Sequence, residues 1–264
     1  MRIRNTSSTV RIPLFSLTAP QGGATKRIKI YRSVGKKRRR PWNDPRLFFT
    51  AGPCGLAGGD DDFFMTQKRD KPSTKDAIIA TAVDLFHRKG YYAASMSDIA
   101  RGSGIHKAGI YYYFSGKETL LYGIMKRTMD DLLAHLKKSL ADAEGVEASM
   151  RAAVRGHVEF HLRRQKENFI ANSELRGLSP AHYKAVVKQR DDYERIFQFL
   201  IRSGVDEGVF AAGDIKILSY AILTLCTAGA FWFKPSGRLS VEHIAGIYED
   251  FVLRGLKDGT MGRE

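Results

Sequence analysis

The sequence has few of the residues that build a disulfide framework, a metal centre or a membrane span. Among 264 residues there are only two cysteines, Cys54 and Cys226, which lie far apart and in no paired motif. Neither a disulfide scaffold nor a CxxC metal site is therefore predicted. We find no apolar run near the roughly 18–20 residues of a membrane span, and the N-terminus lacks the apolar core of a secretory signal. These absences fit a reduced, cytoplasmic setting.

Sequence motifs typical of enzymes are also missing. The sequence contains no G-x-S-x-G, H-E-x-x-H, P-loop or G-x-G-x-x-G motif. His157 and His161 have the i, i+4 spacing that places two side chains on one helix face, but no third metal ligand lies nearby in the sequence. We expect no enzyme activity, no metal site and no cofactor. An all-α enzyme is kept as a remote alternative.

Positive charge is concentrated in the first half of the chain. The formal net charge is +15. Residues 1–65 carry 13 Lys and Arg against 4 Asp and Glu, and residues 66–127 carry 11 against 5, whereas residues 128–264 carry 19 of each sign. A basic segment beside a neutral body predicts a polyanion-binding module attached to another unit. One alternative is a solvated basic surface with no partner. Another, which rests on the N-terminal charge, is a protein that binds nucleic acid or membrane surfaces without specificity.

Residues 1–65 differ in character from the rest of the chain. They contain the basic run Lys36–Arg40, the acidic run Asp60–Asp62 and scattered glycines, and they show no helical or strand period. We expect this segment to be disordered. It is either a DNA-grasping arm or not part of the native product. We favour the second interpretation, with Met65 as the true start.

From residue 74 onward the sequence indicates an all-α fold. The segments expected to be helical near the start are 74–89, 95–102 and 106–114, and glycines follow or separate them. Ser95 and Asp98 form a variant capping box, and Ser115 and Glu118 form a second one before the next helix. Residues 117–258 are helical throughout, with breaks near Gly145, 177–180, 204–213 and 234–237, which makes about nine helices in all.

Two short helices joined by a glycine-containing turn and braced by a preceding helix describe a helix-turn-helix unit. In such a unit the second helix enters the major groove of DNA, which is about 12 Å wide. Residues 93–100, 104–114 and 117–121 strongly resemble the DNA-binding region of the tetracycline-repressor (TetR) family. The most specific element is Tyr-x-Tyr-Phe-x-x-Lys-Glu-x-Leu over residues 111–120. The resemblance covers residues 74–125 closely and implies a ligand-responsive transcriptional repressor.

The resemblance also implies roles for single residues. Base edges would be met by Lys107, Ala108, Gly109 and Tyr112, and phosphate or sugar by Ser95, Tyr111, Tyr113 and Lys117. Packing between the two short helices would come from Ile99, Ala100, Ile105, Ile110 and Phe114. Helical rotation of about 100° per residue does not allow all four consecutive aromatic side chains to face the same way. We expect Phe114 and Ile110 in the core and Tyr112 toward DNA.

A single unit of this kind makes few base contacts, so we expect a dimer that places two of them about 34–36 Å apart on a palindromic operator. The candidate interface is formed by helices near 214–233 and 240–257, which carry apolar residues on more than one face. The alternative is an ordinary buried pair of core helices.

The C-terminal half resembles, over residues 172–180 and 231–240, a TetR subgroup that includes regulators of fatty-acid, sterol and aromatic-acid breakdown, some answering to coenzyme-A thioesters. The resemblance implies an acyl-CoA or lipid-like effector. Candidate pocket residues are aromatic side chains with nearby arginines: Phe160, Phe169, Phe197, Trp232, Arg163, Arg164 and Arg176. The expected organisation is an extension over 1–65, a DNA-binding domain over 66–120, and an effector-binding and dimerisation domain over 121–264.

Overall fold

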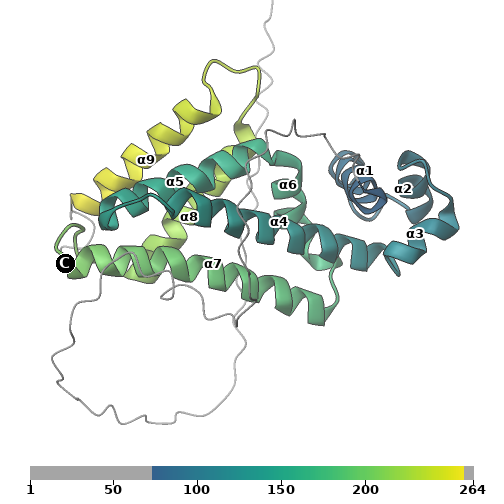
Figure 1. Ribbon diagram of the computed structural model, residues 1–264, viewed down its shortest axis with the longest axis horizontal. Helices are drawn as coiled ribbons and strands as arrows, with labels where there is room; N and C mark the ends of the chain where they lie inside the picture. The colour runs from purple at the N-terminus through teal and green to yellow at the C-terminus, as the bar shows by residue number, and fades with distance from the viewer. Residues whose placement is uncertain (1–72, 259–264) are drawn as a thin grey trace, which may run out of the picture. The chain divides into compact units, whose positions relative to one another are not determined.

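The computed structural model describes residues 73–258, all within one compact unit, and these residues form helices joined by turns, with no strand among them (Figure 1). The elements are α1 (Thr74–Lys89), α2 (Met96–Gly102), α3 (Lys107–Tyr113), α4 (Lys117–Leu140), α5 (Gly145–Arg163), α6 (Gln165–Ser173), the 3-10 turn η2 (Leu175–Gly177), α7 (Pro180–Asp206), α8 (Ile215–Trp232) and α9 (Val241–Lys257). The expected all-α fold is confirmed. The predictions for residues 1–65 lie outside the described residues.

The first helices begin and end where local side chains satisfy the backbone. Ser73 Oγ accepts a hydrogen bond from the Asp76 N–H at 3.2 Å at the start of α1. At the start of α2, Ser95 Oγ accepts from Asp98 N at 3.1 Å and Asp98 Oδ2 accepts from Ser95 N at 3.4 Å, which is the predicted capping box. Gly104, between α2 and α3, has φ +70°, a conformation that glycine adopts at little cost.

The start of α4 differs from the prediction. The N-cap is Gly116, whose N–H donates to Thr119 Oγ1 at 3.0 Å, so Ser115 and Glu118 do not form the expected box. Glu118 instead accepts a hydrogen bond from the Ser179 N–H at 2.7 Å. Because Glu118 accepts hydrogen bonds from Ser179 and His182 at the start of α7, it does not cap α4, and Thr119 forms the cap contact with Gly116.

The head, as we call α1–α3, packs around one apolar cluster. Ile78 and Phe86 of α1, Ile99 of α2 and Ile110 of α3 are fully buried there. The same cluster continues through α4 and reaches Ile170 of α6 and Val186 of α7. The expected domain boundary at residues 120 and 121 lies inside α4, so the head and the body (α4–α9) share one continuous helix and part of one core.

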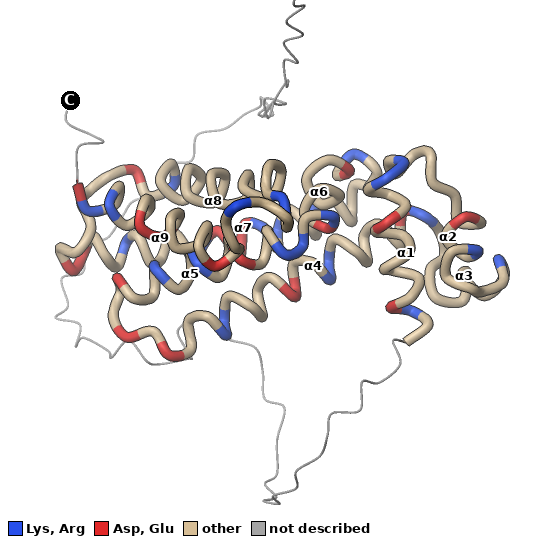
Figure 2. Tube along the Cα trace, turned by 90° about the horizontal axis from the view of Figure 1, so that it is seen from above, with Lys and Arg blue, Asp and Glu red and all other residues tan. Residues whose placement is uncertain are grey.

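The body is built around α5. This helix packs against α4, α7, α8 and α9 (Figure 1), and the resulting core includes Met150 and Val154 of α5, Phe197 of α7 and Leu253 of α9. Basic and acidic residues are intermixed over most of the body (Figure 2), in keeping with the equal numbers of the two signs over residues 128–264. The body therefore folds around apolar contacts and carries no large field of one sign.

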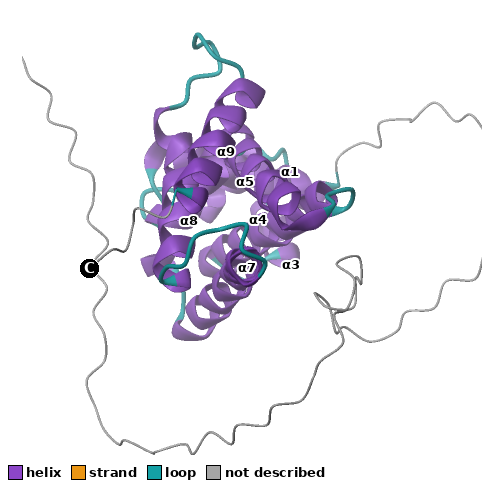
Figure 3. Ribbon diagram, turned by 90° about the vertical axis from the view of Figure 1, so that its left-hand side faces the viewer, coloured by secondary structure: helices purple, strands orange, loops and turns teal. Residues whose placement is uncertain are grey.

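The breaks between body helices largely follow the glycines and prolines of the sequence. The loops drawn in Figure 3 separate α4 from α5 at Gly145, where φ is +79°, and α7 from α8 after Gly208. The break between α5 and α6 was not predicted. It occurs at Arg164, whose φ of −115° and ψ of 44° are not helical. No glycine or proline marks this position, so periodicity alone runs straight through it.

One sequence expectation about apolar runs was wrong. Among the described residues, α8 is long and apolar enough to cross a membrane by length and composition, with a mean hydropathy of 1.5 over its 18 residues. Lys216, Ser219 and Thr227 interrupt its apolar run, although a span tolerates a few such residues. Only 28% of this helix is buried inside the chain. Burial in the core of a single chain therefore does not explain why α8 is so apolar.

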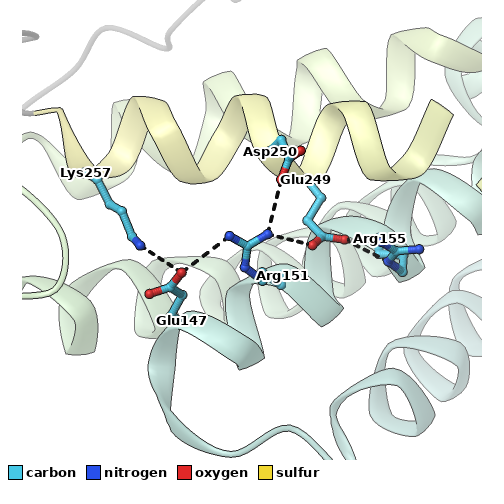
Figure 4. Close-up of polar contacts among 6 residues, drawn as sticks. All are labelled: Glu147, Arg151, Arg155, Glu249, Asp250 and Lys257. Carbon is cyan, nitrogen blue, oxygen red and sulfur yellow. Dashed lines mark hydrogen bonds and ion pairs between the residues drawn. The ribbon is translucent and has the colours of Figure 1, made fainter. Parts of the chain in front are cut away.

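A charged network joins α9 to α5 (Figure 4). The six side chains are Glu147, Arg151, Arg155, Glu249, Asp250 and Lys257. Its centre is Glu249, a buried carboxylate that accepts hydrogen bonds from Arg151 at 2.8 Å and Arg155 at 2.7 Å. A buried carboxylate with two arginine partners is costly to break, so the network holds α9 against α5.

Candidate DNA-recognition helix and effector domain

Helix α3, the candidate recognition helix, has one buried and one exposed side. Ile110 is fully buried, Phe114 follows it into the core, and Ile99 and Ala100 of α2 pack against them. Ile105 is partly buried at the turn. The five residues predicted to hold the two short helices together do so, and α3 therefore cannot rotate without breaking the head's core.

The outer side of α3 presents the residues that were expected to read DNA. Lys107 and Ala108 are exposed, and Tyr112 is 86% exposed with its ring edge-on to Tyr113 at 5.1 Å between centroids. Tyr111 is also exposed. A tyrosine side chain this open to water gains nothing from the core. Such a row of tyrosines beside a lysine suits contact with a polyanion.

Gly109 lies on α3 between the buried and exposed sides. A side chain added there would meet no atom within 4 Å, and no positive φ requires glycine. Glycine is therefore not needed by the head itself, and open space remains at this position for a base edge or a water. Base contact by Gly109 stays a prediction.

Ser95 has a structural role in addition to the expected one. Its hydroxyl accepts from Asp98 N and donates to Asp98 Oδ2 at 2.8 Å, while the side chain stays exposed. A hydroxyl has only one proton to donate to a phosphate oxygen, and Asp98 Oδ2 already accepts it. The predicted phosphate contact would therefore have to share this group with the helix cap, and it stays a prediction.

Lys117 is held by the backbone that follows α1. Its Nζ donates to the carbonyl oxygens of Tyr91 at 3.0 Å, Tyr92 at 3.2 Å and Ala94 at 3.0 Å, and it lies 4.6 Å from the centroid of the Tyr91 ring. These bonds use all three ammonium donors. They explain a lysine at a helix N-terminus, which the helix dipole disfavours. The sequence did not indicate this role, and the expected phosphate contact stays a prediction.

Glu118 connects α4 to the start of α7. Besides the Ser179 N–H, it accepts a hydrogen bond from His182 Nδ1 at 2.8 Å, and the His182 ring stacks on Tyr122 with centroids 3.9 Å apart. Burial raises the pKa of Glu118, but the hydrogen bonds from Ser179 and His182 outweigh it and hold the pKa below its usual value. Since α4 starts directly after α3, this contact ties the recognition helix to the body.

Two ion pairs tie α1 to the body as well. Asp76 pairs with Arg127 of α4, and Asp84 pairs with Lys166 of α6 at 2.7 Å. Hydrogen bonds from Ser73 and Arg127 lower the pKa of Asp76, and the bond from Lys166 lowers that of Asp84. Both pairs are exposed to solvent, so each contributes little to stability alone. Their importance is positional, because they join helices from the head and the body.

The residues predicted for an effector pocket are not brought together into one site. Phe160 and Phe197 are buried in the body core, whereas Phe169 packs edge-on to His87 against the head. Trp232 and Arg176 are exposed, and Arg163 pairs with Glu242. Arg164 lines a cavity between α1, α4 and α6. Aromatic residues at helical spacing were thus mostly core, and their role in ligand binding stays a prediction.

A buried polar cluster in the body was not predicted. His157 lies between Tyr193 Oη at 2.9 Å and Thr227 Oγ1 at 3.0 Å, and the His161 ring centroid is 4.4 Å away. Burial lowers the pKa of His157 well below its usual value and that of His161 to about 4. His161 Nδ1 is buried without a hydrogen-bond partner. Among the described residues no third metal ligand joins the pair.

The outer faces of α8 and α9 are apolar and exposed. The large side chains there are Ile217, Tyr220, Leu225, Phe231 and Trp232 of α8 and Ile247 and Phe251 of α9. Phe251 is 64% exposed, and Ile217 and Phe231 are each 61% exposed. The inner face of α8 is different: Gly229 is buried there and packs against Leu162 and Tyr248 of the same chain. An apolar face of this kind marks an interaction surface.

Comparison with known proteins gives one match that covers the head and the start of α4 and another that covers most of the body. Residues 78–123 match the family described as bacterial regulatory proteins, tetR family, and residues 143–256 match the family described as tetracyclin repressor-like, C-terminal domain. The HTH-type transcriptional repressor KstR2 of Rhodococcus jostii is 22% identical over 188 residues, which cover 70% of this chain and 92% of that protein.

Solved structures agree. The TetR family transcriptional regulator PfmR from Thermus thermophilus has a TM-score of 0.63 and 30% identity, covering 68% of this chain and 98% of that one. AibR in complex with isovaleryl coenzyme A and operator DNA has a TM-score of 0.62 and 25% identity, covering 70% and 98%. The helix-turn-helix head, the helical body and these matches together show that the chain belongs to the tetracycline-repressor (TetR) family of bacterial transcriptional regulators.

Proposed function

We propose that the protein is a cytoplasmic transcriptional repressor that binds a palindromic operator as a dimer and leaves it when a small molecule binds the body. The observation that carries this proposal is the two-sided α3, with Ile110 in the core and Lys107, Tyr111 and Tyr112 facing out. A helix held so firmly and exposed on one side can lie in the major groove with its side chains at base edges and phosphates. The related proteins named above are regulators, which favours this function over an enzyme.

Dimerisation is proposed through α8 and α9. The apolar side chains of these helices, including Ile217, Phe231 and Phe251, are exposed in one copy and would be buried between two. A twofold pair buries the same face on each subunit. It explains the apolar character of α8 better than a membrane does, because α8 packs against α5, α6 and α7 within the chain.

The effector is proposed to be an acyl-CoA or a related lipid-like molecule. The structural relative AibR was solved with isovaleryl coenzyme A and operator DNA, which supports this class for the present chain. Ligand and DNA must oppose each other by the same factor, because coupling between two sites is reciprocal. The continuous α4, which joins α3 to the body and contacts α7 through Glu118, provides a direct mechanical path.

Selection of bound fragments from random DNA with the purified full chain tests the proposal. We expect a palindromic sequence, protected over two half-sites about one helical turn apart. The matched variants are Lys107→Ala on α3 and Lys184→Ala on the exposed surface of α7, and only the first should weaken binding. A chain lacking residues 1–64 should protect the same sequence. Equal affinity for every duplex would support non-specific basic binding instead and refute the proposal.

A further inference from the structure

Arg190 on α7 has an incomplete set of partners in the interior of the body. Its Nη2 donates a hydrogen bond to the backbone oxygen of Ala171 on α6 at 2.6 Å, and no Asp or Glu among the described residues forms an ion pair with it. The guanidinium is withdrawn from water, and this burial lowers its pKa. An arginine is rarely buried without an acidic partner. The chain therefore leaves this positive charge largely uncompensated.

Contacts within the chain account for only part of the arginine's capacity. Ala171 lies in the last turn of α6, so Arg190 caps a helix end that carries about half a negative charge. This contact uses one of the five N–H groups of the guanidinium. Glu194, a buried carboxylate one turn further along α7, does not supply the rest, because it accepts hydrogen bonds from Ser219 and Gln198 instead. Most of the hydrogen-bond donors of Arg190 stay available.

His161 on α5 adds a second polar group that the chain leaves unsatisfied. Only 7% of this residue is exposed, and its Nδ1 has no hydrogen-bond partner among the described residues. Burial lowers the pKa of His161 to about 4, and the positive charge of Arg190 adds to this effect. The two side chains are therefore close enough to interact. At neutral pH the imidazole is uncharged, so it can form a hydrogen bond but brings no second positive charge.

One buried cation beside an unpartnered neutral imidazole suits a ligand with a single negative charge. We propose that the body binds a small monocarboxylic acid, whose carboxylate accepts hydrogen bonds from the Arg190 guanidinium and from His161 Nδ1. A planar guanidinium matches a carboxylate with two parallel hydrogen bonds. A phosphate group carries about −1.5 to −2 charges at pH 7, and one cation would leave part of that charge buried without a partner.

The neighbouring polar groups do not compete for this ligand. His157 has a partner on each ring nitrogen, and Asn172 donates to Asn168 Oδ1 at 2.8 Å. Tyr183 of α7 is 47% exposed and near enough to affect the pKa of Arg190, so the guanidinium lies close to the solvent-facing part of α7. The inference rests on the proposed function and deepens it, because it narrows the effector to a molecule with a free carboxylate.

The test is calorimetric titration of the full chain with isovalerate and with octanoate. Arg190→Met removes the guanidinium and keeps most of its bulk, and Arg202→Met makes the same change at an exposed position on α7. Arg190→Lys keeps the charge and the possible contact with α6 but removes the planar fork. His161→Phe removes Nδ1, and His243→Phe, at an exposed position on α9, is its control.

We expect both acids to bind the unaltered chain, Arg202→Met and His243→Phe alike. Affinity should fall at least about tenfold in Arg190→Met and about threefold to tenfold in Arg190→Lys and His161→Phe, since charge-assisted hydrogen bonds are lost. Absence of binding by both acids, or equal binding by Arg190→Met and Arg202→Met, overturns the inference. Where thermal unfolding shows that Arg190→Met does not fold, unchanged binding by Arg190→Lys and His161→Phe overturns it.

Three further ligands separate the carboxylate from other chemistry. 3-Methylbutanol has the chain of isovalerate without its charge, inorganic phosphate has charge without a chain, and isovaleryl-CoA replaces the carboxylate by a thioester. The alcohol and phosphate should each bind at least about tenfold more weakly than isovalerate. If isovaleryl-CoA binds through Arg190 and the free acids do not, the anchored group is a phosphate and the inference is wrong.

Footprinting of the selected operator with the same proteins separates this inference from the proposed function. If the chain protects its operator but binding of the acids does not depend on Arg190, only the carboxylate site is wrong. If the chain protects no specific sequence, the proposed function itself fails, whatever the acids do. When both hold, octanoate or isovalerate should lower the operator affinity of Arg202→Met and not that of Arg190→Met.

Discussion

The head and the body distribute their polar and apolar residues in opposite ways. In α1–α3 the buried side chains are all apolar, and the large exposed ones near the recognition helix are tyrosines: Tyr92, Tyr111, Tyr112 and Tyr113. In the body, His157, His161, Asn168 and Glu194 are buried, whereas Ile217, Phe231 and Phe251 are exposed. The head is complete except for DNA. The body has apolar residues outside and polar groups inside, and its exposed apolar surface supports the proposed contact with a second copy.

The largest effect is expected from the apolar outside of the body. Changing Ile217 and Phe251 to Asp should give a monomer, because the two charges cannot be buried between copies. Operator affinity should fall by more than a hundredfold, since each monomer then binds a single half-site. Sedimentation and gel-shift measurements report the two effects. Tyr183→Asp, at an exposed site on α7, is the control, and a double variant that stays dimeric would place the interface elsewhere.

The polar inside of the body should make stability depend on pH. The pKa of His161 in the folded chain is about 4, below the usual 6.5, because of burial. Below pH 6.5 the unfolded chain takes up a proton that the folded chain does not. The contribution of His161 to the free energy of unfolding is therefore complete above pH 6.5 and is lost as the pH falls toward 4. The loss from this group is on the order of 3 kcal/mol.

Urea unfolding at pH 7.5, 6 and 5 measures this dependence. His161→Asn should reduce the slope with pH, since one titrating group is gone. His243→Asn, at an exposed position on α9, should leave the slope unchanged. An unchanged slope in His161→Asn would mean that the pKa of His161 is the same in the folded and the unfolded chain.

At the joint of head and body, Lys117→Met should destabilise the chain by about 2 kcal/mol, because three carbonyls lose a charged donor. Lys117→Arg should recover part of that loss. Thermal unfolding measures the change, and operator titration tests the alternative role. A variant of normal stability but weak DNA binding would show that Lys117 acts on phosphate and not on the loop after α1.

The smallest effect on the fold is expected on the outside of the head. Tyr112→Ala removes a side chain that is 86% exposed, so the free energy of unfolding should change by less than about 0.5 kcal/mol. Operator affinity should fall about tenfold, the lower end for one base contact. Tyr183→Ala on α7 should change neither quantity. A stability loss in Tyr112→Ala would show that this ring packs in the head after all.

Much of the head could be predicted because its determinants are local. The capping box of Ser95 and Asp98 and the buried positions of Ile99 and Ile110 depend on residues a few positions apart. The break at Arg164 could not be predicted in the same way, since no glycine or proline signals it. The wide separation of the predicted pocket residues could not be foreseen for a related reason. Helical spacing places Phe160 and Phe197 toward an interior but cannot say whether that interior holds a ligand.

By itself, the sequence determined the all-α fold and the outward side of α3, because helix periodicity and capping act within one or two turns. The family followed from the resemblance of residues 93–100, 104–114 and 117–121. Tertiary structure alone decided that Lys117 binds carbonyls 23 to 26 positions earlier and that Lys166 meets Asp84, 82 positions away. It also decided that a cavity opens between α1, α4 and α6. Such contacts depend on how helices pack, and side chains far apart in the chain meet only after that packing is set.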